Sequence, residues 1–266
     1  MKLSARALGA WIVCASTLVL ASPAFAQERE LRVFAAASLT EVVSELADRF
    51  AASAAASGDA TSVRSRNSFG SSSELARQIA DGAPADVFVS ASPDWIDFLR
   101  EKRALEGEPV VFARNALVCI APKGSGLGAA GVHDLASLFS KGLSPGDLLA
   151  IADAGVPAGE YARQALNAAG LLAPNKQRLL GRRDVRAVLQ SVETSEARAG
   201  FVYATDVRGS DAEVLFHVDP ATHAPILYIA AVTRGAARPA IARRYVDFLR
   251  SSGAQLALAR AGFLAP

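Results

Sequence analysis

Apolar segments alternate with helical patterns from residue 31 to the C-terminus. Residues 31–36 form an apolar run interrupted once, which predicts a strand, and apolar residues recur every three or four positions between 39 and 50, which predicts an amphipathic helix. Further strands are expected at 61–66, 86–90, 116–121, 148–152, 178–181, 200–203, 213–218 and 226–232, and further helices at 73–81, 93–102, 159–169, 184–194 and 237–250. Strands separated by helices indicate an α/β fold with largely parallel sheets.

The first 26 residues follow a different pattern. Lys2 and Arg6 precede an apolar run over 7–20, and Ala24-Phe25-Ala26 ends this segment with small residues at the −3 and −1 positions. This is the pattern of a secretory signal peptide, so we expect cleavage after residue 26 and export to the periplasm. Bulky residues precede Cys14 where lipoprotein processing requires small ones, so no lipid anchor is expected.

Composition and charge then narrow the function classes. The chain has 51% hydrophobic and 20% charged residues, a globular composition. Loss of residues 1–26 removes two of the 28 basic residues and none of the 26 acidic ones, so the mature chain is formally neutral. It therefore has no bulk electrostatic attraction to nucleic acid or anionic membranes. Only Cys119 lies outside the leader, so no internal disulfide is expected.

Four of the predicted helices begin with hydroxyl-bearing or small residues. Ser38-Leu-Thr-Glu41 and Ser71-Ser-Ser-Glu74 have the spacing of a capping box. Val156-Pro-Ala-Gly159 opens a third helix, and Asp184 is a natural N-cap for a fourth, with Val185 as its first helical residue. Each start offers unpaired backbone N–H groups and the positive end of a helix dipole, from which an anion site can be built. Each one taken alone is ordinary helix capping.

Other motifs favour other function classes only weakly. Gly70-Ser-Ser-Ser-Glu74 lacks the second glycine of a nucleophile elbow, and the chain contains no P-loop sequence. Gly124-Ser-Gly126 begins a pattern like a dinucleotide-binding turn, but its Gly/Pro-rich surroundings indicate a flexible loop. His217, Asp219 and His223 lie in a turn-rich segment without tight ligand spacing, so no metal ligand is assigned there.

Six segments of the mature chain, in order, match one known family. They are Val33–Thr40, Phe69–Ile79, Gly82–Ser90, Val156–Ala162, Asp184–Arg186 and Gly200–Tyr203. Together they resemble the periplasmic molybdate-binding proteins of ABC importers, from about residue 31 to the C-terminus. The resemblance implies a two-lobed class II periplasmic-binding-protein fold of the α/β class, with mixed, mostly parallel sheets flanked by helices. It places the ligand in the cleft between the lobes.

The same resemblance implies that a tetrahedral oxyanion is held by hydroxyl and backbone N–H groups, without salt bridges. It places the ligand contacts on the hydroxyl and N–H of Ser38 and Ser72, the N–H of Ala158 and Val185, and the hydroxyl of Tyr203. Molybdate and tungstate are nearly isosteric dianions that present acceptors only, so a site made solely of donors satisfies either. The resemblance implies no cofactor, no catalytic residue and no direct ligand to a metal cation, since molybdenum enters as the oxyanion.

Two segments depart from the pattern of this family. Arg182 and Arg183 give a more basic approach to Asp184 than expected, and residues 151–155 lack the expected Asp-Pro sequence. Neither departure removes a contact residue. The arginines are either a solvated helix entry or an aid to anion attraction, and both interpretations stay open. Within the segment 69–73 the ligand serine of the family falls on Ser72, so Ser71 is expected to cap the helix.

The implied function is that of an extracytoplasmic solute-binding protein. It would capture molybdate or tungstate and deliver it to the membrane permease of an ABC importer, as a monomer and without nucleic acid. The alternatives are a receptor for another tetrahedral oxyanion such as sulfate, an exported serine hydrolase, and a nucleotide-binding module built on 124–129.

The strand expected at 116–121 begins a new set of elements, which suggests where the lobes divide. We expect a signal peptide at 1–26, a first lobe formed by 27–111 with 227–266, and a second lobe formed by 112–226. On this division two of the expected contacts belong to the first lobe and three to the second. An anion that bridges them would draw the lobes together by hinge closure.

Overall fold

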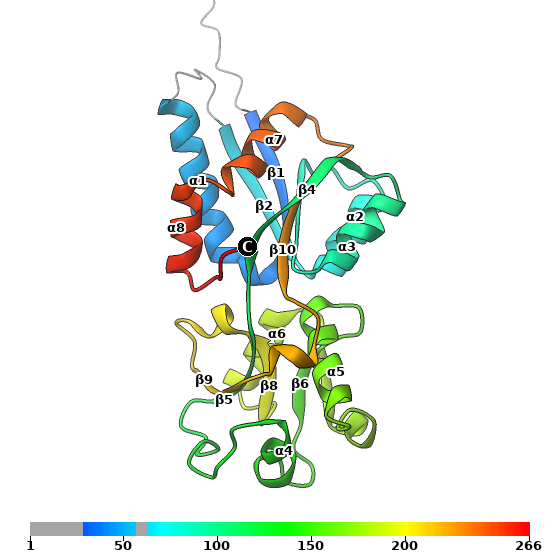
Figure 1. Ribbon diagram of the computed structural model, residues 1–266, viewed down its shortest axis with the longest axis vertical. Helices are drawn as coiled ribbons and strands as arrows, with labels where there is room; N and C mark the ends of the chain where they lie inside the picture. Colours follow the sequence, from blue (N-terminus) through cyan, green and yellow to red (C-terminus); the bar gives the residue numbers. More distant parts are fainter. Residues whose placement is uncertain (1–28, 57–62) are drawn as a thin grey trace, which may run out of the picture.

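The computed structural model describes residues 29–56 and 63–266, so the signal peptide expected at 1–26 lies outside the described residues. Two five-stranded sheets, each flanked by helices, form two lobes stacked along the long axis of the molecule (Figure 1). We refer to the lobe that contains both the first and the last described residues as the first lobe. The two-lobed α/β fold expected from the sequence is confirmed. Within the described ranges, no helix has the length and apolar character needed to cross a membrane.

The sheet of the first lobe lies between two groups of helices. Its strands, in order across the sheet, are β2 (Val63–Gly70), β1 (Arg29–Ala36), β3 (Val87–Ser90), β10 (Leu227–Thr233) and β4 (Leu105–Arg114). On one side lie α1 (Thr40–Ala56), α7 (Pro239–Phe248) and α8 (Ser252–Arg260), and on the other α2 (Ser72–Ala80) and α3 (Pro93–Glu101) (Figure 1).

The alternation of side chains along β1 explains these two layers. Leu31 and Val33 are fully buried in the larger core, to which α1 contributes Leu46, whereas Phe34 packs on the separate cluster beneath α2 and α3. Successive residues of a strand point to opposite faces, so a strand buried on both faces is apolar almost throughout. The nearly continuous apolar run at 31–36 is therefore the signature of a central strand.

The second lobe has the same architecture with shorter strands. Its sheet contains β7 (Leu179–Arg182), β6 (Leu149–Ala152), β8 (Ala199–Tyr203), β5 (Leu117–Pro122) and β9 (Ala212–His217), in this order. Its helices are α4 (Leu135–Ser137), α5 (Pro157–Ala168) and α6 (Val185–Glu193), and a π turn, η2 (Leu138–Gly142), follows α4. Short 3-10 turns are η1 (Ala37–Leu39) in the first lobe, and η3 (Ala173–Arg178), η4 (Ala204–Val207) and η5 (Pro220–Thr222) in the second.

Two crossovers join the lobes. The chain leaves the first sheet after β4 and returns to it at β10, and the crossovers meet where the Asn115 N–H donates to the Ile226 carbonyl at 3.2 Å. Of the eight strand pairs in the described residues, four are parallel and four antiparallel, so parallel pairs are half of the total rather than the expected majority. The antiparallel pairs all involve β5 or β10, the strands that follow the two crossovers.

Candidate functional site

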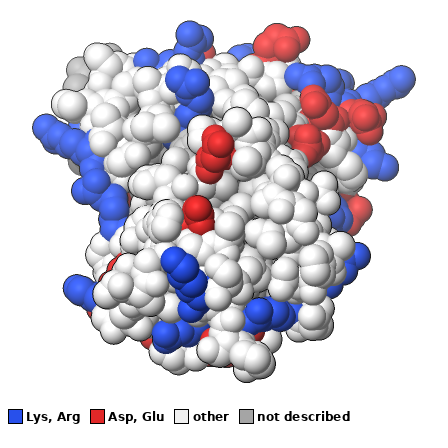
Figure 2. All heavy atoms as spheres, turned by 60° about the horizontal axis from the view of Figure 1, so that its bottom comes forward, with Lys and Arg blue, Asp and Glu red and all other residues white. Residues whose placement is uncertain are grey.

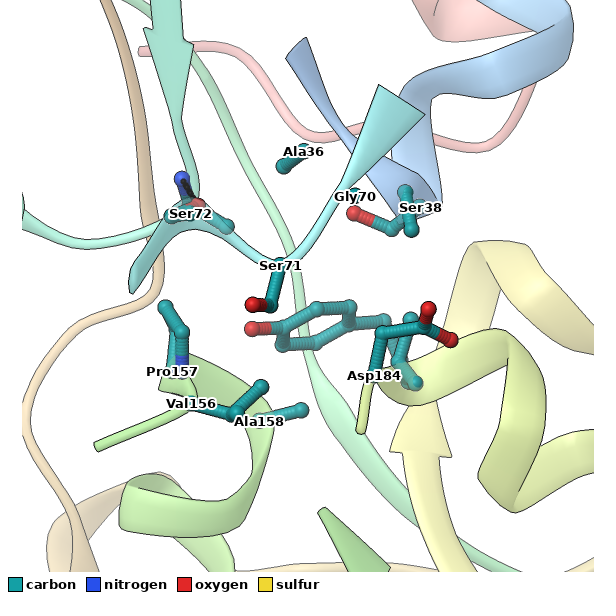
Figure 3. A pocket seen from close by; sticks show the side chains of 13 residues that line it. Ala36, Ser38, Gly70, Ser71, Ser72, Val156, Pro157, Ala158 and Asp184 are labelled. Atoms are coloured by element: carbon teal, nitrogen blue, oxygen red, sulfur yellow. Dashed lines mark hydrogen bonds between the residues drawn. The ribbon is translucent and has the colours of Figure 1, made fainter. Parts of the chain in front are cut away.

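A small cavity lies between the lobes, where the helix starts of both lobes meet (Figure 3). Its lining consists of Ala36, Ala37, Ser38, Gly70, Ser71, Ser72 and Ala91 from the first lobe, and Val156, Pro157, Ala158, Asp184, Val185 and Tyr203 from the second. The structure therefore brings all five residues expected to contact the ligand into one cavity. They are Ser38, Ser72, Ala158, Val185 and Tyr203.

The size of this cavity restricts what it can hold. The space open to the centre of a water molecule is about 20 Å³. Pockets for drug-sized ligands are about 300–1,000 Å³. The cavity thus fits a compact anion and excludes a nucleotide or a sugar.

The serines of the first lobe reach the cavity by two different local structures. Ser72 is the first residue of α2, and its Oγ accepts a hydrogen bond from the Ala91 N–H at 3.0 Å, which leaves its own O–H free to donate. Ser71 precedes it as the N-cap, since its Oγ accepts from the Glu74 N–H at 3.2 Å, so the expected cap is confirmed.

The capping box expected at Ser38 is wrong. A 3-10 turn, η1, stands between β1 and α1, and the helix begins only at Thr40. The Ser38 hydroxyl therefore does not cap α1. It lies instead 2.9 Å from Tyr228 Oη, and Ser38 is buried at the cavity.

The second lobe directs two helix N-termini at the cavity. Val156 is the N-cap of α5, with Pro157 and Ala158 as its first two residues. The Asp184 side chain accepts from the Ala187 N–H at 2.9 Å, which confirms Asp184 as the N-cap of α6 and Val185 as its first residue. N–H groups in a first turn have no partner within their helix, so both starts present free donors.

Glycine at position 159 allows α5 to approach the cavity. A Cβ on Gly159 would lie 2.2 Å from the carbonyl oxygen of Ala152, the last residue of β6. Because that neighbour is backbone, it cannot move aside as a flexible side chain could. Only glycine therefore lets the first turn of α5 pack directly on the end of this strand.

Tyr203 carries the most informative polar atom of the site. It ends β8, its side chain is 2% exposed, and its buried hydroxyl has no hydrogen-bond partner among the described residues. Burial raises the pKa of Tyr203 well above its ordinary value, and Tyr228, Tyr161 and Asp206 raise it further, so the hydroxyl keeps its proton. A buried unpaired donor costs roughly 1–3 kcal/mol, a cost that an acceptor bound in the cavity would remove.

Among the described residues, the lining of the cavity offers hydroxyl and N–H donors and one carboxylate, that of Asp184, but no cationic side chain. Arg182 donates to Ser191 and pairs with Glu196, whereas Arg183 lies 3.5 Å from Asp184 Oδ2 and is largely exposed. The charge of Arg183 thus offsets that of the one carboxylate at the cavity. Figure 2 shows the molecule with the bottom of Figure 1 turned forward, and on that face charged side chains of both signs are scattered rather than gathered into a patch of one sign.

Comparison with known proteins places the chain in a family. Residues 31–264 match the family of bacterial extracellular solute-binding proteins. The chain belongs to this family. It is 36% identical over 250 residues to the molybdate-binding protein ModA of Haemophilus influenzae, which covers 91% of this chain and 92% of that protein.

Solved structures of solute-binding proteins confirm the fold. The periplasmic molybdate-binding protein of Azotobacter vinelandii superimposes with a TM-score of 0.74 at 24% identity, over 89% of this chain and 99% of that chain. The sulfate-binding protein SubI from Mycobacterium tuberculosis also gives a TM-score of 0.74, at 16% identity, over 89% of this chain and 86% of that chain. The fold alone therefore does not distinguish a molybdate-binding protein from a sulfate-binding one. That distinction depends on the chemistry of the cavity.

Direct contacts hold the two lobes of this solute-binding protein together around the cavity. Trp95 Nε1 donates to the Gly155 carbonyl at 3.0 Å, and Tyr161 Oη donates to the Ala91 carbonyl at 3.1 Å. On another side of the cleft, Arg186 pairs with Glu41 across the lobes. The lobes are thus in direct contact in this structure, and one of the cross-lobe hydrogen bonds reaches Ala91 in the lining of the cavity. We refer to this arrangement, with the lobes in contact, as the closed form.

A buried ion pair supports one of these cross-lobe contacts. Arg186 Nε lies 3.4 Å from Oδ1 of Asp206, whose side chain is fully buried. Burial raises the pKa of Asp206 to about 7, although Arg186 and the Tyr203 N–H both act to lower it. No local sequence pattern marks Asp206, because its burial depends on the packing of η4 beneath α6.

The weaker motifs of the sequence form no comparable site. In the ranges that the structure covers, no three His, Cys, Asp or Glu side chains form a cluster suited to a metal ion, and this includes His217, Asp219 and His223. Gly124 and Gly126 both have a positive φ of 75°, as expected of a turn-rich loop.

Proposed function

We propose that the chain captures molybdate or tungstate outside the cytoplasm and delivers it to the membrane permease of an ABC importer. The observation that carries this proposal is the buried Tyr203 hydroxyl, which has no partner among residues 29–56 and 63–266. It lies at a cavity whose lining, within those ranges, offers hydroxyl and N–H donors and no cationic side chain. Membership of the extracellular solute-binding family supports a receptor rather than an enzyme. The relative from Haemophilus influenzae, named as molybdate-binding, supports the choice of anion.

The proposed contacts are those expected from the sequence. Ser38 and Ser72 contribute a hydroxyl and an N–H each, Ala158 and Val185 contribute N–H groups, and Tyr203 contributes its hydroxyl. About seven charge-assisted bonds of about 1.5–3 kcal/mol each give a gross stabilisation of roughly 10–20 kcal/mol. Ordering and desolvation costs reduce this to about −8 to −12 kcal/mol, a micromolar to nanomolar Kd.

Selectivity follows from protonation and from size. A full dianion accepts from every donor, whereas phosphate carries a proton at neutral pH and needs an acceptor. The carboxylate at the cavity, Asp184, already accepts from the Ala187 N–H and pairs with Arg183. Sulfate is fully deprotonated but smaller, so donors fixed around a larger anion would leave it with stretched bonds. The second candidate, a sulfate receptor, is supported by the likeness in fold to a sulfate-binding protein.

The location and the motion of the protein belong to the same proposal. The N-terminal pattern over 1–26 supports export to the periplasm, where the protein acts as a monomer. We place the first lobe at 27–111 with 227–266 and the second at 112–226, with hinge closure at the two crossovers. Membership of the two sheets supports this division, although β4 continues to Arg114, past the boundary at 111.

Calorimetric titration of the ligand-free protein with molybdate, tungstate, sulfate and phosphate tests the proposal. We expect strong binding of the first two and at least a hundredfold weaker sulfate binding, or roughly 2.7 kcal/mol of discrimination. Equal sulfate and molybdate affinities would support the sulfate receptor instead. Turnover of generic esters without oxyanion binding would support the exported hydrolase.

A further inference from the structure

A chain of buried hydrogen bonds runs from Ser38 to the junction of the lobes. Tyr228 Oη lies 2.9 Å from Ser38 Oγ, and Asn115 Nδ2 donates both to that Oη, at 3.2 Å, and to Thr205 Oγ1, at 2.9 Å. Asn115 lies in the first crossover, Tyr228 follows the second, and Thr205 belongs to η4 of the second lobe. Ser38, Asn115 and Tyr228 are all buried.

The direction of each hydrogen bond in this chain can be assigned by counting donors. The Ala116 N–H donates to Asn115 Oδ1 at 2.9 Å, which fixes the amide so that its two N–H donors face Thr205 and Tyr228. Tyr228 Oη therefore accepts from Asn115. Among the described residues, Ser38 Oγ is the one acceptor within hydrogen-bond distance of Tyr228 Oη, so donation from Tyr228 to Ser38 is the direction that does not leave the buried Tyr228 proton unpaired. Burial raises the pKa of Tyr228 far above its ordinary value, so this proton stays in place.

The consequence appears at the cavity. Ser38 Oγ accepts from Tyr228, so the proton of Ser38 itself is free to donate elsewhere. Ser38 lines the cavity and also a neighbouring hollow beside Glu41 and Arg186, so an anion bound in the cavity is within the reach of that proton. A serine without this partner could rotate and present either its proton or its lone pairs to a ligand.

We propose that Asn115 and Tyr228 are positioning residues that hold Ser38 as a hydrogen-bond donor and thereby favour fully deprotonated oxyanions over protonated ones. This inference rests on the proposed function. Neither residue lines the cavity, so they act through Ser38 rather than by touching the anion.

Asn115→Asp tests the direction of these hydrogen bonds, because Asp has nearly the same shape as Asn. A carboxylate only accepts, so Tyr228 would turn its proton to Asp at 115 and Ser38 would turn its own proton to Tyr228. Lone pairs of Ser38 would then face the dianion. At about pH 8, we expect molybdate affinity to fall roughly 10- to 100-fold.

Two control variants interrupt the chain without reversing it. Tyr228→Phe and Asn115→Leu leave Ser38 free to donate, so we expect each to cost less than about fivefold in affinity. If these residues mattered only for packing, the order would be the opposite, because Asp is the closest of the three substitutes to the native shape. Equal affinity of Asn115→Asp and wild type, or this opposite order, would overturn the inference.

A double-variant comparison separates the role of Ser38 from a direct charge effect. In a Ser38→Ala background, we expect Asn115→Asp to cost only a few-fold, because no hydroxyl remains to be reversed. An undiminished loss in that background would mean that the new charge repels the anion through space, which contradicts the inference.

Titration of the same variants with inorganic phosphate gives a second readout. The ratio of molybdate to phosphate affinity should fall in Asn115→Asp, and to a smaller extent in Tyr228→Phe, where Ser38 can rotate and accept from a protonated anion.

Neutron diffraction from deuterated wild-type crystals tests the same point without any variant. We expect deuterium of Tyr228 directed at Ser38 Oγ and deuterium of Ser38 directed into the cavity. Deuterium of Ser38 directed at Tyr228 would overturn the inference. Wild-type protein that fails to bind molybdate would instead contradict the proposed function, so the two failures are distinguishable.

Discussion

The two lobes present their donors to the cavity in different ways. The first lobe offers the side-chain hydroxyls of Ser38 and Ser72, whose oxygens are held by partners within the same lobe. The second lobe offers mainly the backbone N–H groups of Ala158 and Val185, placed by the starts of α5 and α6. A hydroxyl contact requires a particular side chain, whereas an N–H contact requires only that a helix begin at the correct residue. The two halves of the site should therefore respond differently to substitution.

The largest expected effect separates a backbone donor from the side chain that carries it. Asp184 is extended, with φ −156° and ψ 175°, so it tolerates a following proline, and a proline at the first helical position breaks no helical bond. Val185→Pro should keep the fold and delete one donor at the positive end of a helix dipole. We expect a loss of about 1.5–3 kcal/mol, or roughly 10- to 150-fold in affinity for molybdate.

Val185→Ala is the matched control for this variant, because it keeps the N–H and should bind within a few-fold of wild type. The measurement is a pair of calorimetric titrations, with circular dichroism to confirm that both variants fold. Wild-type affinity in the proline variant, or equal losses in both, would show that the N–H is not the contact.

Removal of the Tyr203 hydroxyl, which is the one hydroxyl that the second lobe offers, should have different effects with and without ligand. Tyr203→Phe removes a buried donor that has no partner in the structure, so the ligand-free protein should be equally stable or up to about 1 kcal/mol more stable. With molybdate, the same variant should bind roughly 10- to 100-fold more weakly, because a charge-assisted bond to the anion is lost. Thermal unfolding with and without molybdate checks both signs, and a destabilised ligand-free variant would argue against an unpaired hydroxyl.

A smaller effect is expected from the bond that Tyr161 makes between the lobes. Tyr161→Phe removes its hydrogen bond to the Ala91 carbonyl and leaves the lining of the cavity intact. The closed form should lose about 0.5–1.5 kcal/mol, which weakens molybdate binding by roughly 2- to 12-fold. Tyr245→Phe is the matched control. It deletes another buried hydroxyl, which lies in the first lobe and has no hydrogen-bond partner among the described residues. If both variants bind alike, the cross-lobe bond does not stabilise closure.

The last prediction concerns stability rather than affinity, and it rests on Asp206 of the second lobe. The pKa of Asp206 is raised to about 7 by burial, above the ordinary value of about 4 for an unfolded aspartate. Its contribution to stability is therefore complete below about pH 4 and is lost as the pH rises through about 7. We expect a lower melting temperature at about pH 8 than at about pH 5, and a flatter profile in Asp206→Asn. A profile that is unchanged in this variant would assign the pH dependence to other groups.

Sequence patterns within a single helical turn predicted the helix caps of the site. The N-caps Ser71 and Asp184 were predictable because a cap is defined by residues within one turn. The strand β4 was missed, since Gly107, Pro109 and several charged residues interrupt its pattern. It lies at the edge of its sheet, where such residues are tolerated.

Contacts between distant residues could not be read from the sequence. Ser38 and Tyr228 are 190 residues apart, and Asn115 and Tyr228 are 113 apart, so no spacing rule connects them. The capping box expected at Ser38 was wrong for a local reason, because a 3-10 turn delays the start of α1 to Thr40. The partner that its hydroxyl has instead, Tyr228, comes from the other end of the chain. Helix α8 was also missed, and its Ser251 cap and alanine-rich sequence carry only a weak amphipathic pattern.

Anomalous diffraction at the molybdenum absorption edge, from crystals grown with molybdate, tests most directly whether donors of both lobes share one anion. We expect a single strong peak in the cavity, with oxygens within hydrogen-bond distance of Ser38, Ser72 and the Tyr203 hydroxyl, and of the N–H groups of Ala158 and Val185. No arginine or lysine side chain should contact it. A peak outside the cavity, or one held by the donors of a single lobe, would contradict the site described above.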